Sequence, residues 1–435
     1  MIIREGIKRA IGHNKTRFFM PGHKGDGRLS LYYDVTEIDG TDNLQNPDGI
    51  IKKAMDNAAH VFGAKKTFFL VNGSSVGIGA LVMSLCNRGE TLIVDRACHI
   101  SVINAIILND IRPVFIYPEY NKKFGIYNSI NSLCVEDALI KHPNAKGVLI
   151  TSPNYYGVCS NVEIIAQLTH KYNKALIVDE AHGAHFVFGN SLPKAALLSG
   201  ADGVIQSAHK TLCCITQGAL LHLGSSRIDA DCVRENLNML HTTSPSYLIM
   251  MSIDDSVTKA SKSSDIKTKR VIEQCKSLKE NINKTGKLIC LNSNDVTRIT
   301  INAGKNANCL NYILKKDYNI ISEMCDGQNI VFIANMFSSA KDIKKLENAL
   351  IGISKKLLKS EPLPNIAPPR LKLAMTPAAA YYNQTETVIP QLSVDRIAAR
   401  AIYKMPPCTC AVLPGETITQ EAAQFITGKV KVVKR

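Results

Sequence analysis

The sequence lacks any apolar run long enough to cross a membrane, a span that requires about 20 consecutive apolar residues. Its first 19 residues, MIIREGIKRAIGHNKTRFF, also lack the uninterrupted apolar centre of a secretory signal. Hydrophobic residues make up 45% of the 435 positions and charged residues 20%, which is ordinary for a soluble globular protein. We therefore expect a cytoplasmic protein without a membrane partner.

None of the thirteen cysteines belongs to a CxxC pair. The close pairs are Cys213-Cys214 and Cys408-Thr409-Cys410, neither of which has the spacing of a common zinc site. Without an export signal, reduced thiols are favoured over disulfides. The sequence thus predicts no metal site.

The formal net charge of +15 requires that nucleic acid be considered as a partner. The lysines are scattered, and the densest basic runs, KASKSSDIKTKR and KVKVVKR, lack interleaved aromatic residues. No nucleic-acid recognition motif occurs, so we expect solvated basic surface and no nucleic-acid function. A basic field can also attract the phosphate of a cofactor.

The length of the chain favours two or three domains, and the sequence contains no internal repeat and no low-complexity segment. Composition and turn residues divide it into four parts. We expect an N-terminal arm of loops at 1–45, a large domain at 46–262, a small α+β domain at 263–360 and a C-terminal domain at 371–435. The proline-rich stretch EPLPNIAPPR links the last two parts.

Seven short apolar runs between residues 67 and 223 predict the strands of one sheet. They are TFFLVN, TLIVD, PVFIY, GVLIT, ALIVDE, GVIQS and GALLHL. Continuous apolar runs indicate strands buried on both faces, and helical stretches between them indicate crossover connections. We therefore predict an α/β domain with a mostly parallel seven-stranded sheet, whose ligands bind beyond the carboxyl ends of the strands.

Lys210 follows one of these strands in the turn Ser207-Ala208-His209-Lys210, between segments of buried character. A lysine placed there is either paired with a carboxylate or used covalently. The covalent use is a Schiff base with pyridoxal phosphate (PLP), which requires a lysine of lowered pKa near a phosphate-binding turn. This stretch alone leaves both interpretations open.

Three further strand ends carry polar residues. Ser74 and Ser75 open a helix, where free N–H groups and hydroxyls form either an anion site or an ordinary cap. His99 either stacks on an aromatic cofactor or caps the next helix. Asp179 precedes Lys210 by about one crossover helix and one strand, so the two residues should lie close together. Considered without the other residues, Asp179 could also be a metal ligand or a helix cap. A PLP site needs this combination of lysine, acid and anion site.

The chain resembles the bacterial ornithine/lysine/arginine decarboxylase family, which has the aspartate-aminotransferase type of PLP fold (fold type I). The matching segments, spread over nearly the whole chain, are MPGHKGD, TEIDGTDNLQNPDG, FGAKKTFFLVNGSSVG, DRACHISV, TSPNYYGV, VDEAHGAHFVF, QSAHKTL, TTSPSY, TPAAAYY, ETV and PPCTCAVLPGE. The chain lacks the N-terminal wing domain of many members and so resembles the short form. The resemblance implies a PLP-dependent decarboxylase that releases CO2 from arginine, lysine or ornithine to give a polyamine precursor.

The resemblance also implies roles for individual residues. Lys210 would form the Schiff base, Asp179 would pair with the pyridinium nitrogen, and His99 and Ala181 would pack on opposite ring faces. The phosphate would be held by Ser74, Ser75, Ser207 and His209; His182 would line the pocket; and Thr243 and Ser244 would come from the partner subunit of a homodimer or higher even oligomer. Lys210 or His209 would return a proton to the substrate Cα.

The sequence departs from the family at Ile100, where a basic residue is usual, and at Cys408-Thr409-Cys410, where PPGIP is usual. The second departure lies near the region expected to contact the substrate tail. Glu416 and Glu386 are the acids expected to meet the distal cation of the substrate, and analogy with short-form relatives favours arginine. An aminotransferase and a PLP-binding protein without catalytic activity remain as alternatives.

Overall fold

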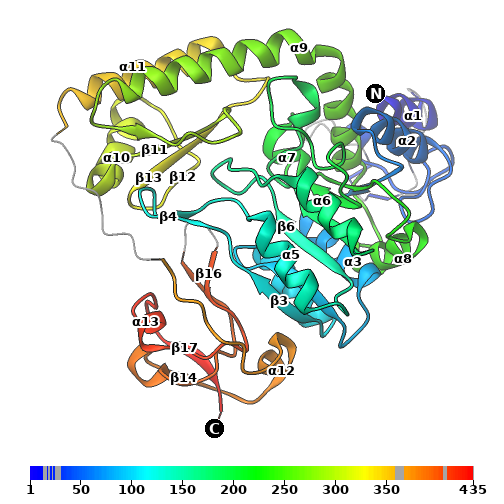
Figure 1. The fold of residues 1–435 in the computed structure, drawn as a ribbon. Helices are drawn as coiled ribbons and strands as arrows, with labels where there is room; N and C mark the ends of the chain where they lie inside the picture. Colours follow the sequence, from blue (N-terminus) through cyan, green and yellow to red (C-terminus); the bar gives the residue numbers. More distant parts are fainter. Residues whose placement is uncertain are drawn as a thin grey trace.

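The structure is a computed structural model that describes residues 1–12, 17, 20–21, 23–24, 31–357, 367–404 and 409–434. It consists of a large α/β domain, a small domain that includes helices α9 (Tyr247–Asn283) and α11 (Ala340–Ser354), and a C-terminal domain (Figure 1). No helix in the described part of the chain is long and apolar enough to span a bilayer.

The predicted seven-stranded sheet is confirmed, with strand order β1-β9-β8-β7-β6-β2-β3. The strands are β1 (Lys66–Leu70), β2 (Thr91–Asp95), β3 (Arg112–Ile116), β6 (Gly147–Thr151), β7 (Ala175–Asp179), β8 (Gly203–Gln206) and β9 (Ala219–Leu223). Strand β9 runs antiparallel to both of its neighbours, and the other pairings are parallel. The carboxyl ends of β2, β6, β7 and β8 therefore lie along one edge.

Helices cover both faces of this sheet and bury it from both sides. They are α2 (Ile50–Phe62), α3 (Ser74–Leu85), α4 (Ile100–Leu108), α5 (Ser132–Lys141), α6 (Val162–Lys171) and α8 (Ala230–Leu240), with the short α7 (Ala208–Thr211) after β8. In β2, Ile93 faces one apolar core while Leu92 and Val94 face another. This two-sided burial explains why the strands appear as continuous apolar runs.

The opening of the chain differs from the predicted arm of loops. Residues 2–11 form helix α1 (Ile2–Ile11), which buries Ile3, Ile7 and Ile11 and packs against α2 and α9. Its first turn is fixed where the Ile3 N–H donates to Asp254 Oδ2 (3.0 Å). The four-residue spacing of the isoleucines is a helical signal, so the expectation of loops was wrong here. Part of MPGHKGD lies outside the described residues.

Helix α9 (Tyr247–Asn283) is continuous across the expected division between residues 262 and 263. Its first half packs into the core of the large domain through Tyr247, Met250 and Val257. Its second half packs into the core of the small domain through Val271 and Leu278. The two domains therefore share one helix and have no flexible linker at this point.

The small domain is an antiparallel sheet covered by helices. Its strands, in the order β10-β11-β13-β12, are β10 (Ile289–Cys290), β11 (Arg298–Asn302), β13 (Asn329–Ile333) and β12 (Met324–Cys325), and its helices are α10 (Ala307–Asp317) and α11 (Ala340–Ser354). The predicted α+β character agrees with this arrangement. Helix α10 and strand β12 were not predicted.

The C-terminal domain consists of short elements around a small apolar core that includes Val412, Ile418 and Val432. The elements are α12 (Pro377–Tyr382), β14 (Thr385–Val388), β15 (Ile402–Lys404), β16 (Thr409–Val412), α13 (Gln420–Ala423) and β17 (Val430–Val433). Strands β14 and β17 pair, as do β15 and β16. The hairpin of β4 (Tyr120–Asn121) and β5 (Ile126–Tyr127) extends from the large domain toward the small domain (Figure 1).

Candidate active site

The predicted residues meet in a cavity of about 450 Å³ at the carboxyl edge of the large sheet. The large domain contributes strand-end residues, and the β4–β5 hairpin, the segment around β12 and the C-terminal domain complete the walls. Seven of the large-domain lining residues are Ser74, His99, Thr151, Asp179, Ala181, His182 and Lys210. The structure thus brings together the lysine, the acid and the anion-binding helix end that the sequence placed at separate strand ends.

The side chain of Lys210 is held by a short chain of contacts. Its Nζ lies 3.1 Å from Nε2 of His182, and Nδ1 of the same ring lies 3.1 Å from Nη2 of Arg298. A guanidinium can only donate, so Nδ1 accepts and Nε2 carries the proton. That proton points at Lys210 Nζ, which can accept it only as a neutral amine. The geometry therefore favours the nucleophilic form of Lys210.

The electrostatic environment acts in the same direction. Burial lowers the pKa of Lys210, an effect that the charge of Asp179 opposes and that of Arg298 reinforces. Burial also lowers the pKa of His182 well below its usual value, and the charges of Lys210 and Arg298 add to this shift. A neutral histidine and a neutral amine are consistent with the hydrogen-bond directions, and a lysine of lowered pKa is the form that attacks an aldehyde.

Asp179 ends strand β7 and is 4% exposed. Its Oδ1 accepts the N–H of Ala181 (3.1 Å). Burial raises the pKa of Asp179, while the nearby Lys210 and His99 oppose this shift. A buried carboxylate in a cavity is stabilised by a cationic donor, and the N–H of a pyridinium ring is such a donor.

His99 caps the next helix, as one of the two interpretations of the sequence expected, and it also lines the cavity. It is the N-cap of α4, where its Nδ1 accepts the N–H of Ser101 (3.2 Å) and lies 2.9 Å from the hydroxyl of the same residue. Its ring also lines the cavity, as does Ala181. The cap fixes the orientation of the ring, which suits a surface for a flat cofactor. Stacking itself stays a prediction.

Two groups near the start of helix α3 and the end of strand β8 have unsatisfied donors, and binding of an anion there stays a prediction. Helix α3 begins at Ser74 without a side-chain cap on its first N–H groups, and Ser74 lines the cavity. The hydroxyl of Ser207 is fully buried and has no hydrogen-bond partner in the described structure. A buried hydroxyl and free N–H groups at a helix start are the donors that a phosphate requires. Ser75, in the same turn, is exposed.

Five residues predicted for the cofactor site do not line this cavity in the described part of the chain: Ser75, Ser207, His209, Thr243 and Ser244. His209 donates its Nδ1–H to a backbone carbonyl (3.0 Å). Thr243 and Ser244 are exposed, next to Thr242, whose N–H donates to Asn72 (3.3 Å) just before helix α3. Their roles, including a contribution from a second subunit, stay predictions.

The structure contradicts the predicted substrate contact of Glu416. This carboxylate is fully buried and accepts Nε (3.0 Å) and Nη2 (2.9 Å) of Arg96, together with the N–H of Leu413 (2.7 Å). The buried guanidinium needs this counter-charge, so Glu416 is committed to an ion pair between domains. Glu386 is bound to Arg396 and does not line the cavity either.

Two residues of the site were not found from the sequence. Arg298, 1% exposed on β11, sets the tautomer of His182, and the signal was an arginine at the head of the short strand RITIN. Glu323, just before β12, lines the cavity opposite the strand ends. Its segment lacks a strong pattern, and only the folded small domain brings it to the site.

A seven-stranded sheet with a lysine, an aspartate and a histidine at adjoining strand ends defines the aspartate-aminotransferase type of PLP fold. The solved structure of the Escherichia coli constitutive lysine decarboxylase superposes with a TM-score of 0.83 at 18% identity, covering 99% of this chain and 82% of that chain.

The sequence comparisons identify the family. The model described as Orn/Lys/Arg decarboxylase, major domain, matches residues 10–303. The arginine decarboxylase of Bacillus subtilis (strain 168) is 32% identical, covering 97% of this chain and 92% of that protein. The arginine decarboxylase of Halalkalibacterium halodurans is 34% identical, and the match covers 97% of this chain and 91% of that protein. The chain belongs to the Orn/Lys/Arg decarboxylase family.

Family and fold confirm the predictions made from the motifs, and pyridoxal phosphate is the cofactor of this family. The residues present fit that group. Lys210 and Asp179 line the cavity and would be available for its aldehyde and its ring nitrogen. The start of α3 at Ser74 would offer donors to its phosphate, and the buried, unpartnered hydroxyl of Ser207 lies just after β8.

Proposed function

We propose that this protein is a PLP-dependent decarboxylase of a basic amino acid, with arginine preferred over lysine and ornithine. The observation that carries the proposal is the charge of the cavity wall. Its charged lining residues are Asp179, Lys210, Glu323 and Asp326, and no arginine lines it in the described part of the chain. Three carboxylates outnumber the one lysine, so the wall is net negative, which suits a substrate with an additional positive charge.

The same wall argues for decarboxylation over transamination. An aminotransferase typically clamps the substrate carboxylate with an arginine, whereas a decarboxylase gains by leaving that carboxylate poorly solvated. Tyrosines 120, 127, 155 and 156 line the cavity together with Phe425, so much of its wall is aromatic. A carboxylate placed there loses hydration without gaining an ion pair.

The residues of the site provide the proton positions that the reaction needs. A bound PLP supplies a protonated ring that accepts the electron pair left behind when CO2 departs. Asp179, held by the Ala181 N–H, keeps the proton on the ring nitrogen. Lys210 Nζ lies next to the Nε2–H of His182 and would be placed to return a proton to Cα of the substrate.

The preference for arginine is supported by the relatives. Proteins named arginine decarboxylase align with 97% of this chain, whereas Lysine decarboxylase LdcA of Pseudomonas aeruginosa aligns with 56% of it at 28% identity. The test is incubation of the holoenzyme with arginine, lysine, ornithine and the neutral isostere citrulline, assaying CO2 and amine. Amine formation from arginine ahead of the others is expected, and formation of a 2-oxo acid instead would support the aminotransferase.

We also propose that the protein works as a homodimer, or a higher even oligomer, with shared sites. Thr243 and Ser244 are exposed next to the start of α3, which supports a role at a subunit interface. Mixing Lys210→Ala subunits with subunits altered at Thr243 and Ser244 should restore part of the activity. Failure of mixed dimers to recover activity, once subunit exchange is demonstrated, counts against shared sites. A cytoplasmic location stays a prediction.

A further inference from the structure

Because Glu416 pairs with Arg96, the distal cation of the substrate has no assigned partner among the predicted residues. Besides Asp179, which is committed to the cofactor ring, the cavity is lined by two carboxylates, Glu323 and Asp326. Both belong to the small domain, on the side of the cavity opposite the strand ends of the large domain. Their hydrogen bonds distinguish them.

Asp326 is saturated by its own neighbourhood. Its Oδ1 accepts the N–H groups of Gln328 (3.0 Å) and Asn329 (2.7 Å). Its Oδ2 accepts the hydroxyl of Tyr156 (2.9 Å) and the Asn329 side-chain amide (2.8 Å). These four hydrogen bonds stabilise the turn before β13. The carboxylate of Asp326 therefore has a structural role and little capacity left to accept hydrogen bonds from a ligand.

Glu323 is held differently. Its Oε1 accepts the hydroxyl of Tyr155 (2.8 Å), and its Oε2 has no protein partner within the described residues. The backbone N–H of Glu323 donates to the carbonyl of Val331 (2.9 Å), which fixes the position of the residue at the edge of the sheet. The carboxylate of this exposed, cavity-lining residue is thus oriented by the protein but retains one oxygen for a ligand.

The tyrosine that holds Glu323 also contacts the reacting end of the site. The Tyr155 ring meets the His182 ring edge-on with centroids 5.1 Å apart, and His182 contacts Lys210. Asn154 makes the loop rigid, because its Oδ1 accepts two backbone N–H groups and its Nδ2 donates to the Tyr127 carbonyl (2.8 Å). Glu323 is therefore connected to the lysine through one tyrosine and one histidine, and its charge raises the pKa of Lys210.

On the basis of the proposed decarboxylase function, we propose that Glu323, positioned by Tyr155, binds the distal cation of the substrate. The open oxygen accepts a charge-assisted hydrogen bond from a guanidinium or ammonium group. The neighbouring tyrosine rings favour a planar guanidinium, which also stacks on aromatic faces. This contact selects arginine over a neutral amino acid of the same shape.

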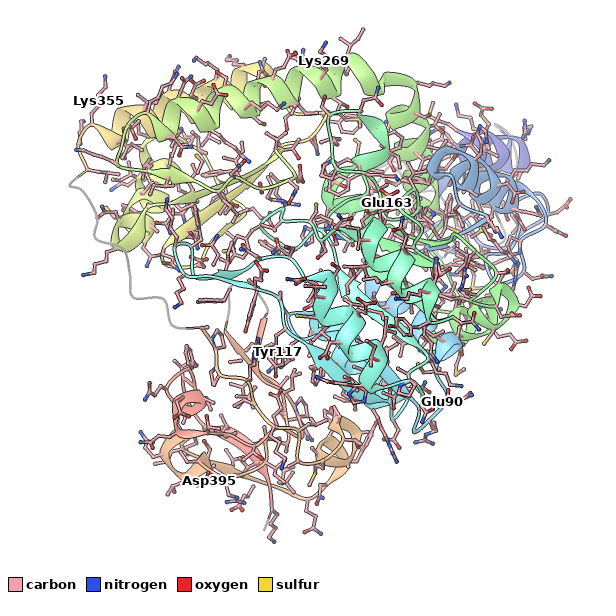
Figure 2. The ribbon with its side chains drawn as sticks, viewed as in Figure 1. Glu90, Tyr117, Glu163, Lys269, Lys355 and Asp395 are labelled. Atoms are coloured by element: carbon pink, nitrogen blue, oxygen red, sulfur yellow. The ribbon has the colours of Figure 1, made fainter. Side chains whose placement is uncertain are left out.

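The test compares Glu323→Gln with Glu163→Gln, the same change on the exposed face of α6, outside this cavity (Figure 2). In Glu323→Gln, kcat/KM for arginine should fall by about 30-fold or more, because a cation left without its carboxylate is poorly compensated. For citrulline, kcat/KM should not fall, and the control should behave as wild type with both substrates. An equal loss for arginine and citrulline would overturn the proposal.

A binding measurement separates this proposal from the proposed function. Agmatine, the amine that arginine decarboxylation yields, should bind the wild-type holoenzyme and the Glu163→Gln control equally, and Glu323→Gln more weakly. If no basic amino acid releases CO2 but agmatine binding still depends on Glu323, the proposed activity fails and the cation site stands. Equal agmatine affinity in all three proteins would contradict the cation site regardless of activity.

A second variant covers the case in which Glu323→Gln does not fold. Tyr155→Phe removes the hydroxyl that orients Glu323 and leaves the ring against His182. It should raise KM for arginine more than it lowers kcat, without a matching change for citrulline. A loss confined to kcat would assign Tyr155 to the reacting centre and would refute its role in orienting Glu323.

Discussion

Replacing Glu416 by glutamine should weaken the attachment of the C-terminal domain to the large domain. The carboxylate is 1% exposed as a side chain and its partner Arg96 is 6% exposed, so the pair is shielded from solvent. Arg96 follows strand β2, and its Nη1 also donates to the carbonyl of Cys410 (2.9 Å). Cys410 lines the cavity, so this ion pair holds one wall of the active site in place.

The magnitude follows from the three hydrogen bonds that the carboxylate accepts. Oε2 serves both Arg96 Nη2 and Leu413 N, and Oε1 serves Arg96 Nε. A glutamine can supply one oxygen, so its NH2 group must face a donor, and the buried guanidinium loses its counter-charge. Breaking a buried pair in this way costs about 3–5 kcal/mol. The equilibrium for detachment should shift by about two to four orders of magnitude.

The assay is backbone hydrogen exchange of residues 409–416, combined with the urea concentration at which the C-terminal domain detaches. Arg370 lies with its guanidinium carbon 4.9 Å from the ring centroid of Tyr117, at the junction of the same two domains (Figure 2). Residues around Tyr117 should therefore become more exposed to exchange as well. The kcat/KM value should fall with the loss of the cavity wall.

Glu386→Gln is the matched control. Like Glu416, Glu386 pairs with an arginine, but this arginine, Arg396, belongs to the same domain as Glu386. The Glu386 side chain is 42% exposed, and exposed ion pairs contribute about 0–1 kcal/mol to stability. It should leave exchange and activity near wild type. A double-mutant cycle of Glu416→Gln with Arg96→Met should show strong coupling. Equal stability of the Glu416→Gln and Glu386→Gln proteins would refute the reasoning.

Three further predictions concern the cofactor. Lys210→Ala should bind PLP without covalent linkage, and borohydride reduction of the wild type should fix the cofactor to Lys210; fixation to another lysine contradicts the assignment. Asp179→Asn should keep PLP but lose most decarboxylation, since a neutral amide cannot hold the ring proton; a loss of two- to threefold would mean a structural role. Because burial lowers the pKa of Lys210 from 10.5, PLP uptake by the apoprotein should rise with pH and level off below 10.5. Arg298→Met should move that midpoint upward, and an unchanged midpoint would exclude the role of Arg298.

The pKa of Lys210 also has a consequence for stability. In the apoprotein the folded chain binds fewer protons at this group than the unfolded chain, over the pH range between the lowered pKa and 10.5. The free energy of unfolding should therefore rise with pH across that window. The destabilisation caused by burying the Lys210 amine should be largest below that window. Lys210→Met should abolish this component of the pH dependence.

The large domain was predictable from the sequence because its signals are local. Each strand is a continuous apolar run, and each polar strand end follows within a few residues, as at Asp179 and His99. The parallel topology then forces these ends onto one edge, so the site could be assembled without coordinates. Helix α1 carried an equally clear pattern in Ile3, Ile7 and Ile11, which the polar residues around it obscured.

The contacts between domains were not predictable in the same way. Glu416 was assigned to the substrate from its position in a motif, but its partner Arg96 lies 320 residues away in the sequence. Glu323 reaches the cavity only because β12 is the edge strand of the small sheet and because Tyr155 arrives from the large domain. Pairings of this kind depend on how three domains pack, for which a single sequence carries no local signal.

The most direct test of the central claim follows the carboxyl carbon of arginine through one round of reaction. With carboxyl-labelled arginine, the wild-type holoenzyme should release the label as CO2 in step with agmatine formation. The Lys210→Ala variant should not release labelled CO2 at a rate comparable to that of the wild type. Label retained in a 2-oxo acid, or arginine bound and recovered unchanged, would contradict the assignment of this protein as a decarboxylase of basic amino acids.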